Sequence, residues 1–361
     1  MIKRISVLLV VALGLAFAFA SSVSAQITSY TSGFQVANQS STQASIVITY
    51  YNQDGSVNAT VNETIPGNGS LTFFPIDASA GFNGSVVISS DQPIVAISNL
   101  LGNGGAAGAS FESFSAGAAT NNLPIIMKGN FGFDTWFSTQ NTGTDAADVT
   151  VSYSGQASCN ETATIQAGAA ATFNQATNTC LPSGYVGAAT VTVTDTANDS
   201  IATTVVQQNA TQLLAYNGFT TGATEPVMPL VQGENFGFVT GIQIQNTGNT
   251  STSVTVSYVA GSAGSNCTET TSIAAGASET FALSSSCTGI GGATFVGAAS
   301  VTNNSNNQPL AAIVNQTNLG DSGSAYNAID SASATGTVSF PLIMQANFGF
   351  FTGFNVIIRQ A

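Results

Sequence analysis

The residues with the most distinctive chemistry in this sequence are four cysteines, which fall in two pairs of similar spacing. Cys159 precedes Cys180 and Cys267 precedes Cys287, and each pair encloses about 20 residues. Zinc binding is the rival chemistry, but the sequence has neither a CxxC pair nor a histidine to support it. In an exported chain this pattern predicts two local disulfides, each worth roughly 3 kcal/mol of stability.

Groups for catalysis are scarce. Without any histidine, the chain cannot form a Ser-His-Asp or Cys-His arrangement. The carboxylate pairs that a glycosidase would need are Asp145 with Asp148 and Asp195 with Asp199, and both fall in predicted turns without an aromatic-rich surrounding. We therefore expect no enzyme and no catalytic residue. The same turns offer oxygens to Ca²⁺, but they lack the dense acidic spacing of a dedicated loop, so no cofactor or metal is expected.

Two other residue types relate to carbohydrate. Trp136, the only tryptophan, lies in an alternating segment, which favours a core position over a sugar-stacking surface. Asn-x-Ser/Thr sequons slightly exceed what the composition alone produces, and they are glycosylation acceptors where the host has the machinery. They include Asn58, Asn62, Asn83, Asn160, Asn209, Asn266 and Asn315.

Residues 1–25 have the pattern of a secretory signal peptide. Lys3 and Arg4 form a basic start, Ile5–Ala20 form an apolar core, and a small-x-small sequence ends at Ala25. An uncleaved anchor is the alternative, but the core is short for a membrane span and no stop-transfer charges follow it. The pattern predicts a mature chain that begins at Gln26.

The charge balance excludes two classes of partner. Removal of the signal peptide leaves Lys128 and Arg359 as the only basic residues against 17 acidic ones. Nucleic acids and anionic membrane surfaces need cationic side chains that this chain lacks. With 43% hydrophobic and 6% charged residues, the chain is expected to fold and to expose Ser, Thr, Asn, Gln and Gly. We expect an extracellular or cell-surface protein that is not membrane-embedded and whose partners are other copies of itself or other cell-surface components.

Three blocks recur in the same order with a period of about 104 residues, which indicates tandem domains. The opening block contains Pro and ends in Asn-Phe-Gly-Phe, where glycine is expected to take a positive φ between two strands. The second block leads through an asparagine turn into an alternating strand that ends in tyrosine, and the third is a glycine-containing strand. The opening blocks are Leu123–Phe133, Val227–Phe238 and Phe340–Phe350, and the strands expected after them are Trp136–Asn141, Gly241–Asn246 and Gly353–Ile358.

Each repeat alternates apolar with polar residues and is rich in Thr and Val, as half-buried strands are. Seven or so short strands in about 105 residues predict the fold class: all-β, with tandem antiparallel immunoglobulin-like β-sandwich domains after an N-terminal signal peptide. The predicted organisation is a signal peptide (1–25), a first repeat without the opening block (26–122), two further repeats (123–226 and 227–339) and a partial fourth repeat (340–361).

These motifs resemble a known type of domain. The asparagine turn, the strand Val-Thr-Val-Ser-Tyr and the Ile-x-Ala-Gly turn that follows are similar to bacterial extracellular immunoglobulin-like repeats of the cell-adhesion-related type. The opening block is similar to that of repeat-rich surface proteins of Chloroflexota-type bacteria. The resemblance covers most of the mature chain, implies a surface or adhesive role, and brings no catalytic residues with it.

The two ends of the repeat array are complementary, because the first repeat lacks the opening block that residues 340–361 supply. We hypothesise that this segment completes the first domain of another copy by strand addition, which would build an open filament. Two alternatives remain: packing on the third repeat or on its linker, Gly323–Ser339, and truncation of a longer array, since Ile357–Ala361 departs abruptly from the pattern. The candidate donor side chains are Phe340, Leu342, Met344, Phe348 and Phe350.

The sequence thus predicts a secreted cell-surface structural repeat protein, a filament or sheath subunit joined head to tail through residues 340–361. The alternative function is that of an adhesin or carbohydrate-binding surface protein, which would need exposed aromatic side chains or a metal-bound loop.

Overall fold

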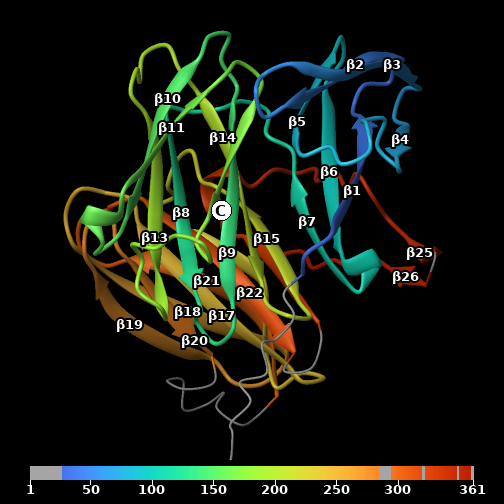
Figure 1. Cartoon of the computed structure of the whole chain (residues 1–361). Coiled ribbons are helices and arrows are strands. Elements are labelled where there is room, and N and C mark those ends of the chain that lie inside the picture. Colours follow the sequence, from blue (N-terminus) through green and yellow to red (C-terminus); the bar gives the residue numbers. More distant parts are fainter. Residues whose placement is uncertain (1–26, 284–293, 319–321, 348, 359–361) are drawn as a thin grey trace, which may run out of the picture.

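The computed structural model describes residues 27–283, 294–318, 322–347 and 349–358, so the predicted signal peptide lies outside it. The described chain forms three antiparallel β-sandwiches in tandem, and the predicted fold class is confirmed (Figure 1). No helix in the described part is long and apolar enough to cross a bilayer.

Domain 1 has one sheet in the order β4-β1-β6-β7 and a second in the order β3-β2-β5. Its core gathers the inward side chains of both sheets around Tyr50 and Phe34. The elements are β1 (Tyr30–Asn38), β2 (Ala44–Asn52), β3 (Val57–Ile65), β4 (Ser70–Phe73), β5 (Gly84–Ser90), β6 (Ile94–Gly102), the 3-10 turn η1 (Asn103–Gly105) and β7 (Ala107–Glu112).

Domain 2 has the sheets β11-β10-β13-β8 and β12-β9-β14-β15, so its first sheet carries a fourth strand, β8, next to the strand that corresponds to β5. The elements are β8 (Thr120–Lys128), β9 (Asp134–Asn141), β10 (Ala147–Tyr153), the 3-10 turn η2 (Ala157–Cys159), β11 (Glu161–Ile165), β12 (Ala170–Asn174), β13 (Tyr185–Val193), β14 (Ile201–Gln208) and β15 (Leu213–Asn217).

Domain 3 repeats this plan with the sheets β19-β18-β21-β16-β24 and β20-β17-β22-β23. The elements are β16 (Pro226–Gly233), β17 (Phe238–Asn246), β18 (Thr252–Ala263), β19 (Cys267–Ile273), β20 (Ser278–Ala282), β21 (Phe295–Asn303), β22 (Leu310–Asn318), β23 (Gly323–Asn327), β24 (Ile329–Asp330) and the 3-10 turn η3 (Ser331–Ser333).

The strands follow from period-two patterning. In β10 the side chains of Ala147, Val149, Val151 and Tyr153 are buried, while Asp148 and Ser152 between them are exposed. Since successive side chains of a strand point to opposite faces, this alternation places one face in the core and the other in solvent. Val and Thr fit such a half-buried pleated surface.

A buried asparagine closes each sandwich at the turn of the second block. The Nδ2 of Asn141 donates to the carbonyls of Asp145 (2.7 Å) and Ile165 (2.8 Å), and its Oδ1 accepts from the Gly143 amide (2.8 Å). Asn246 makes the equivalent three contacts in domain 3, and Asn38 has the same role in domain 1. The recurring asparagine is therefore structural, because it satisfies backbone groups inside the fold.

The main contacts between the domains are made by the sheets that contain β7, β15 and β23. A mixed apolar cluster joins domains 1 and 2 and includes Leu100 of β6 and Val206 of β14. The edge strands β7, β15 and β23, one from each domain, contact one another. Asn217 of β15 donates to the Glu112 carbonyl (2.8 Å) and accepts, through its own carbonyl, from Asn327 (2.7 Å). Strand β8 also contacts β17 and β22 of the next domain.

The segment from Gly323 onward differs from the prediction in two respects. Residues 323–330 were expected within a linker, but β23 and β24 pair with β22 and β16 and belong to domain 3. The strand expected at Gly353–Ile358 does not form in the described chain, where only a small hairpin of β25 (Gln345–Asn347) and β26 (Phe350–Phe351) is present. A lone strand with no sheet beside it has nothing to pair with, which explains the difference.

Candidate functional site

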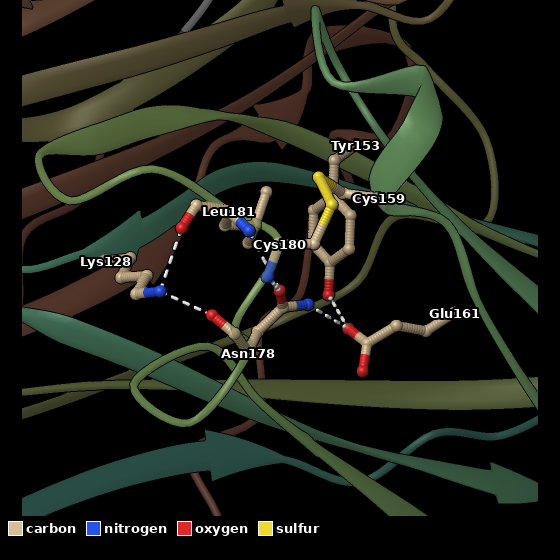
Figure 2. Close-up of a disulfide and its surroundings, with 7 residues drawn as sticks. All are labelled: Lys128, Tyr153, Cys159, Glu161, Asn178, Cys180 and Leu181. Carbon is tan, nitrogen blue, oxygen red and sulfur yellow. Dashed lines mark hydrogen bonds between the residues drawn. A yellow bond between two sulfur atoms is a disulfide. The ribbon is translucent and has the colours of Figure 1, made fainter.

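The first cysteine pair forms the predicted disulfide. Cys159 and Cys180 are bonded, with their Cα atoms 5.4 Å apart, and Figure 2 shows the bond beside the connection from β12 to β13. Asn178 organises this connection, since its Oδ1 accepts from the amides of Cys180 and Leu181 (both 2.9 Å). Lys128 donates to the carbonyls of Asn178 and Leu181. The site therefore fixes a loop.

A tyrosine and a carboxylate complete this cluster. The Tyr153 hydroxyl donates to Glu161 Oε1 (2.5 Å), and the Asn178 Nδ2 donates to the same oxygen (2.8 Å), as drawn in Figure 2. Burial and the neighbouring Glu161 carboxylate raise the pKa of Tyr153. A phenol held protonated in this way is a hydrogen-bond donor within the fold.

Removal of the disulfide should destabilise domain 2 without changing its fold. The double variant Cys159→Ser and Cys180→Ser frees a loop of 21 residues, and the loop-entropy model gives a loss of about 3 kcal/mol. Urea unfolding followed by the fluorescence of Trp136, which lies in β9 of the same domain, measures this loss. An unchanged unfolding midpoint would contradict it.

The second cysteine pair is only half described. Cys267 begins β19, while Cys287 lies outside the described residues. The disulfide between them stays a prediction.

The acidic residues singled out by the sequence stabilise local structure. Asp148, which was expected in a turn, lies in β10 and accepts from the Thr164 hydroxyl (2.6 Å). The Asp195 carboxylate accepts from the Asn198 side chain (2.8 Å) and from the Ala197 amide (3.2 Å), and these bonds lower its pKa. Within the described ranges, no group of three or more Asp, Glu or Cys residues could hold a metal ion. Calcium binding at these turns is left as a prediction.

Trp136 lies at the contact between domains 1 and 2. Its ring meets that of Tyr30 edge to face at 5.7 Å, and its indole Nε1 donates to Gln208 Oε1 (3.0 Å). The ring packs partly buried against the cluster that joins the two domains. The sequence predicted that Trp136 packs in a core and is not a surface residue, but it did not reveal that the contact lies between two domains.

The sequons lie in unlike surroundings. Asn62, Asn83, Asn160 and Asn266 are exposed. Asn315, in contrast, exchanges two hydrogen bonds with Gln207 of domain 2, so a glycan there would separate two domains. Asn58 and Asn209 are half-buried and bonded within domains 1 and 2.

The Asn-Phe-Gly-Phe turns expose aromatic rings that the sequence analysis missed. Phe131 has φ 48° and Gly132 has φ 82°, which are the two positive angles of a type I′ hairpin turn. The predicted glycine role is thus confirmed, but the phenylalanine is left-handed as well, and its side chain is 97% exposed. Phe236 repeats this with φ 51° and 90% exposure, whereas Phe348 lies outside the described residues. An aromatic residue is disfavoured in such a backbone and in such exposure.

Replacing this residue should stabilise the protein. Phe131→Asn creates the Asn-Gly pair that a type I′ turn prefers, and we expect a gain of about 1 kcal/mol. Phe131→Ala removes the ring but keeps the disfavoured backbone, so it should give little gain and is the matched control. Urea unfolding monitored by Trp136 compares the two, and a destabilised Phe131→Asn variant would contradict the expectation.

The open edge of domain 1 and the exposed hairpin of residues 340–358 form the most distinctive arrangement in the described chain. Among the described residues, strand β5 ends its sheet without the neighbour that β8 and β16 supply in domains 2 and 3. Phe340 is 45% and Ile343 56% exposed, yet Leu123 and Ile126, their counterparts in the opening block of domain 2, are fully buried. Ile343 was not among the predicted donor residues, because a period-two pattern predicts only one buried face, whereas β8 is buried on both.

The remaining donor candidates are also placed by this comparison. Leu342 and Met344 are partly buried, and Phe350 is exposed in β26. The Met344 amide donates to Thr352 Oγ1 (2.9 Å), as the Met127 amide does to Thr135 Oγ1 (3.1 Å) in domain 2. The hairpin thus has the geometry of an opening block without a sandwich around it.

Comparisons with known proteins give little further information. No family model matches the sequence, and no curated protein matches it. One similar solved structure is the crystal structure of a tetra-tandem repeat in the extending region of a large adhesion protein. It shares 14% sequence identity, the match covers 81% of this chain and 68% of that chain, and the TM-score is 0.15. A TM-score this low supports no inference, so the resemblance to bacterial immunoglobulin-like repeats and to Chloroflexota-type surface proteins stays an expectation.

Proposed function

We propose that this chain is an extracellular structural repeat protein whose copies join head to tail through the hairpin of residues 340–358. The observation that carries the proposal is the exposure of Phe340 and Ile343 at positions where the same block is fully buried in domain 2. Exposed apolar side chains in a row mark an interaction surface. An oxidising compartment fits the disulfide of domain 2.

The chemistry of the surface suits such a role. The chain offers neutral, hydrogen-bonding side chains and very few cations, so association depends on apolar contacts and strand pairing. A head-to-tail contact does not close on itself, and its repetition gives a filament or sheath. The predicted signal peptide would bring the chain to the cell surface.

Concentration-dependent association tests this function. The secreted chain, produced with its disulfides, should form oligomers that lengthen with concentration, visible as fibres by negative-stain electron microscopy. Sedimentation as a monomer over the whole accessible concentration range, together with an absence of fibres, would refute the proposal.

A second function, adhesion or carbohydrate binding, is favoured by one observation. Phe131 and Phe236 expose almost their whole rings on strained turns, and such strain is retained where it serves a function. A glycan array comparing the secreted chain with a Phe131→Asn and Phe236→Asn variant, with and without chelator, tests this. Glycan binding that the variant loses supports an adhesin function. If the secreted chain binds no glycan on the array, this second function is refuted.

A further inference from the structure

We propose that residues 340–347 of one copy pair with the free edge of β5 in domain 1 of a second copy, antiparallel and in one fixed register. This inference rests on the proposed function, that copies join through the 340–358 hairpin, and it adds the acceptor edge and the register. In this register, Phe340 faces Val86 and Ile343 faces Gly84.

The acceptor edge follows from the sheet order. In domains 2 and 3 the strands β13 and β21 lie between a central partner and an opening strand, β8 or β16. The equivalent strand of domain 1, β5, pairs with β2 on one side and ends the sheet on the other, within the described residues. A row of backbone donors and acceptors at such an edge is a template for another strand.

The equivalence of β5, β13 and β21 is fixed by their pairing with the central strand. A tyrosine at the end of that strand faces one residue of each, as the pairs Tyr50–Val86, Tyr153–Ala189 and Tyr258–Ala299 show. Two residues further along, Val191 of β13 is fully buried, whereas Ile88 of β5 is only partly buried. The core of domain 1 is therefore open where the opening strand covers it in domain 2.

The acceptor strand keeps the backbone shape that receives an opening strand. Gly187 and Gly297 lie opposite Ile126 and Val231 of the opening strands, and Gly84 is their counterpart in β5. A Cβ atom at Gly84 would lie 2.0 Å from the Tyr51 carbonyl oxygen, much as one at Gly297 would lie 2.1 Å from that of Val259. Only glycine fits so close to the central strand. Domain 1 keeps this glycine, although no opening strand pairs with β5 among the described residues.

The register is transferred from domain 2. Leu123 of β8 faces Ala189 and Ile126 faces Gly187, with an irregularity between the two pairs at Pro124. The same spacing recurs in Phe340, Pro341 and Ile343. When this segment pairs with β5 in the register of β8 with β13, Phe340 faces Val86 and Ile343 faces Gly84.

Only the first strand of the hairpin has a vacant place in domain 1. The second strand aligns Phe354 with Phe137 of β9, and in domain 1 that position is held by Phe34 of β1. Ser32 of β1 stands where Thr135 receives the Met127 amide, so it offers a hydroxyl to Met344. Residues 340–347 are therefore the donor, and Phe350 lies beyond the new strand pair.

Charge and neighbouring structure are compatible with this pairing. Residues 340–347 and β5 contain no charged side chain, so two acidic chains meet there without local repulsion. Domain 2 lies next to the edge, where the Ser85 hydroxyl donates to the Gly168 carbonyl (2.5 Å). Because β8 contacts β17 and β22 of the following domain, an incoming strand between domains 1 and 2 repeats an arrangement already present.

The occupant is a second copy. In Figure 1, β25 and β26 project beyond domain 1 and lie well apart from β5. The same chain's donor residues are held there by contacts within the hairpin, with the rings of Phe340 and Phe354 4.8 Å apart. They are thus presented outward, toward another molecule.

Disulfide trapping tests the edge and the register. Two single variants of the secreted chain, Val86→Cys and Phe340→Cys, are mixed under mild oxidation. Directly opposed strand residues have Cα atoms within disulfide reach, whereas residues displaced by two positions do not. We expect a covalent dimer from this mixture and at least tenfold less from the control mixture of Ile88→Cys with Phe340→Cys.

The outcomes separate this inference from the function on which it rests. Oligomers by sedimentation with no Val86 cross-link, or with equal trapping at Ile88, overturn the proposed edge or register while head-to-tail association stands. Absence of both oligomers and cross-link overturns the proposed function as well. The double variant in one chain should give a ladder of covalent multimers, and a cross-linked monomer instead would overturn the second copy as occupant.

A gain-of-function variant tests the same register independently. In domain 2 the Tyr216 hydroxyl donates to the Ile125 carbonyl (2.7 Å), and Tyr326 does the same to Leu230 in domain 3. The pairing of β6 with β7 places Phe111 at this position in domain 1. Phe111→Tyr offers the Leu342 carbonyl a donor, and we expect about fivefold tighter association. Unchanged or weaker association would contradict the predicted position of the Leu342 carbonyl next to residue 111.

Discussion

Replacing both Phe340 and Ile343 with serine is expected to weaken the association of copies about 1000-fold. Each side chain contributes roughly 2 kcal/mol when it passes from solvent into an apolar core. Since about 1.4 kcal/mol corresponds to a factor of ten, losing both removes about three orders of magnitude. Sedimentation velocity over a dilution series measures the association constant.

A matched variant controls for nonspecific stickiness. Val356 is 67% exposed in the same segment but lies beyond the donor strand, because it aligns with Thr139 of β9. Val356→Ser should therefore leave association nearly unchanged. Because all three side chains are exposed, neither variant should alter the unfolding of the three sandwiches. Equal losses in both variants would contradict strand addition at defined positions.

The second large effect concerns Asn141. Asn141→Ala is expected to destabilise domain 2 by about 3 kcal/mol, because it removes two donors and one acceptor from a fully buried position and leaves the Ile165 carbonyl without this partner. Urea unfolding followed by Trp136 emission reports on this domain. Asn141→Asp should be at least as destabilising, since a carboxylate cannot donate to carbonyls and would be a buried charge.

An exposed asparagine provides the comparison. Asn198 donates to Asp195 in a solvent-exposed turn of the same domain, and Asn198→Ala should cost less than about 1 kcal/mol. If Asn141→Ala costs no more than this, the buried asparagine does not hold the sandwich together.

The fold class was predictable from the sequence because its signals are local. Alternation in segments such as Val149–Tyr153 identifies strands, and the repetition of whole blocks identifies tandem domains. The disulfide between Cys159 and Cys180 was predictable since the two residues belong to one repeat. The conformation of glycine in the Asn-Phe-Gly-Phe turn followed from turn chemistry.

What the sequence did not reveal depends on contacts between distant elements. Ile343 was missed because the burial of both faces of β8 comes from packing against the next domain, which leaves no periodic signal. Trp136 was expected in a core and instead lies between two domains. Residues 323–330 read as a linker because β23 and β24 are short edge strands. Strand β23 pairs with the preceding strand, β22, whereas β16, the partner of β24, is far away in the sequence.

The central claim is that the strand of residues 340–347 from one copy completes domain 1 of another. Competition by a synthetic peptide of residues 339–347 tests it most directly, with sedimentation velocity of the secreted chain as the readout. We predict that saturating peptide converts the oligomers to monomers, while a peptide with Ile343→Ser leaves them intact. Oligomers that persist unchanged in the presence of the unmodified peptide would contradict the claim.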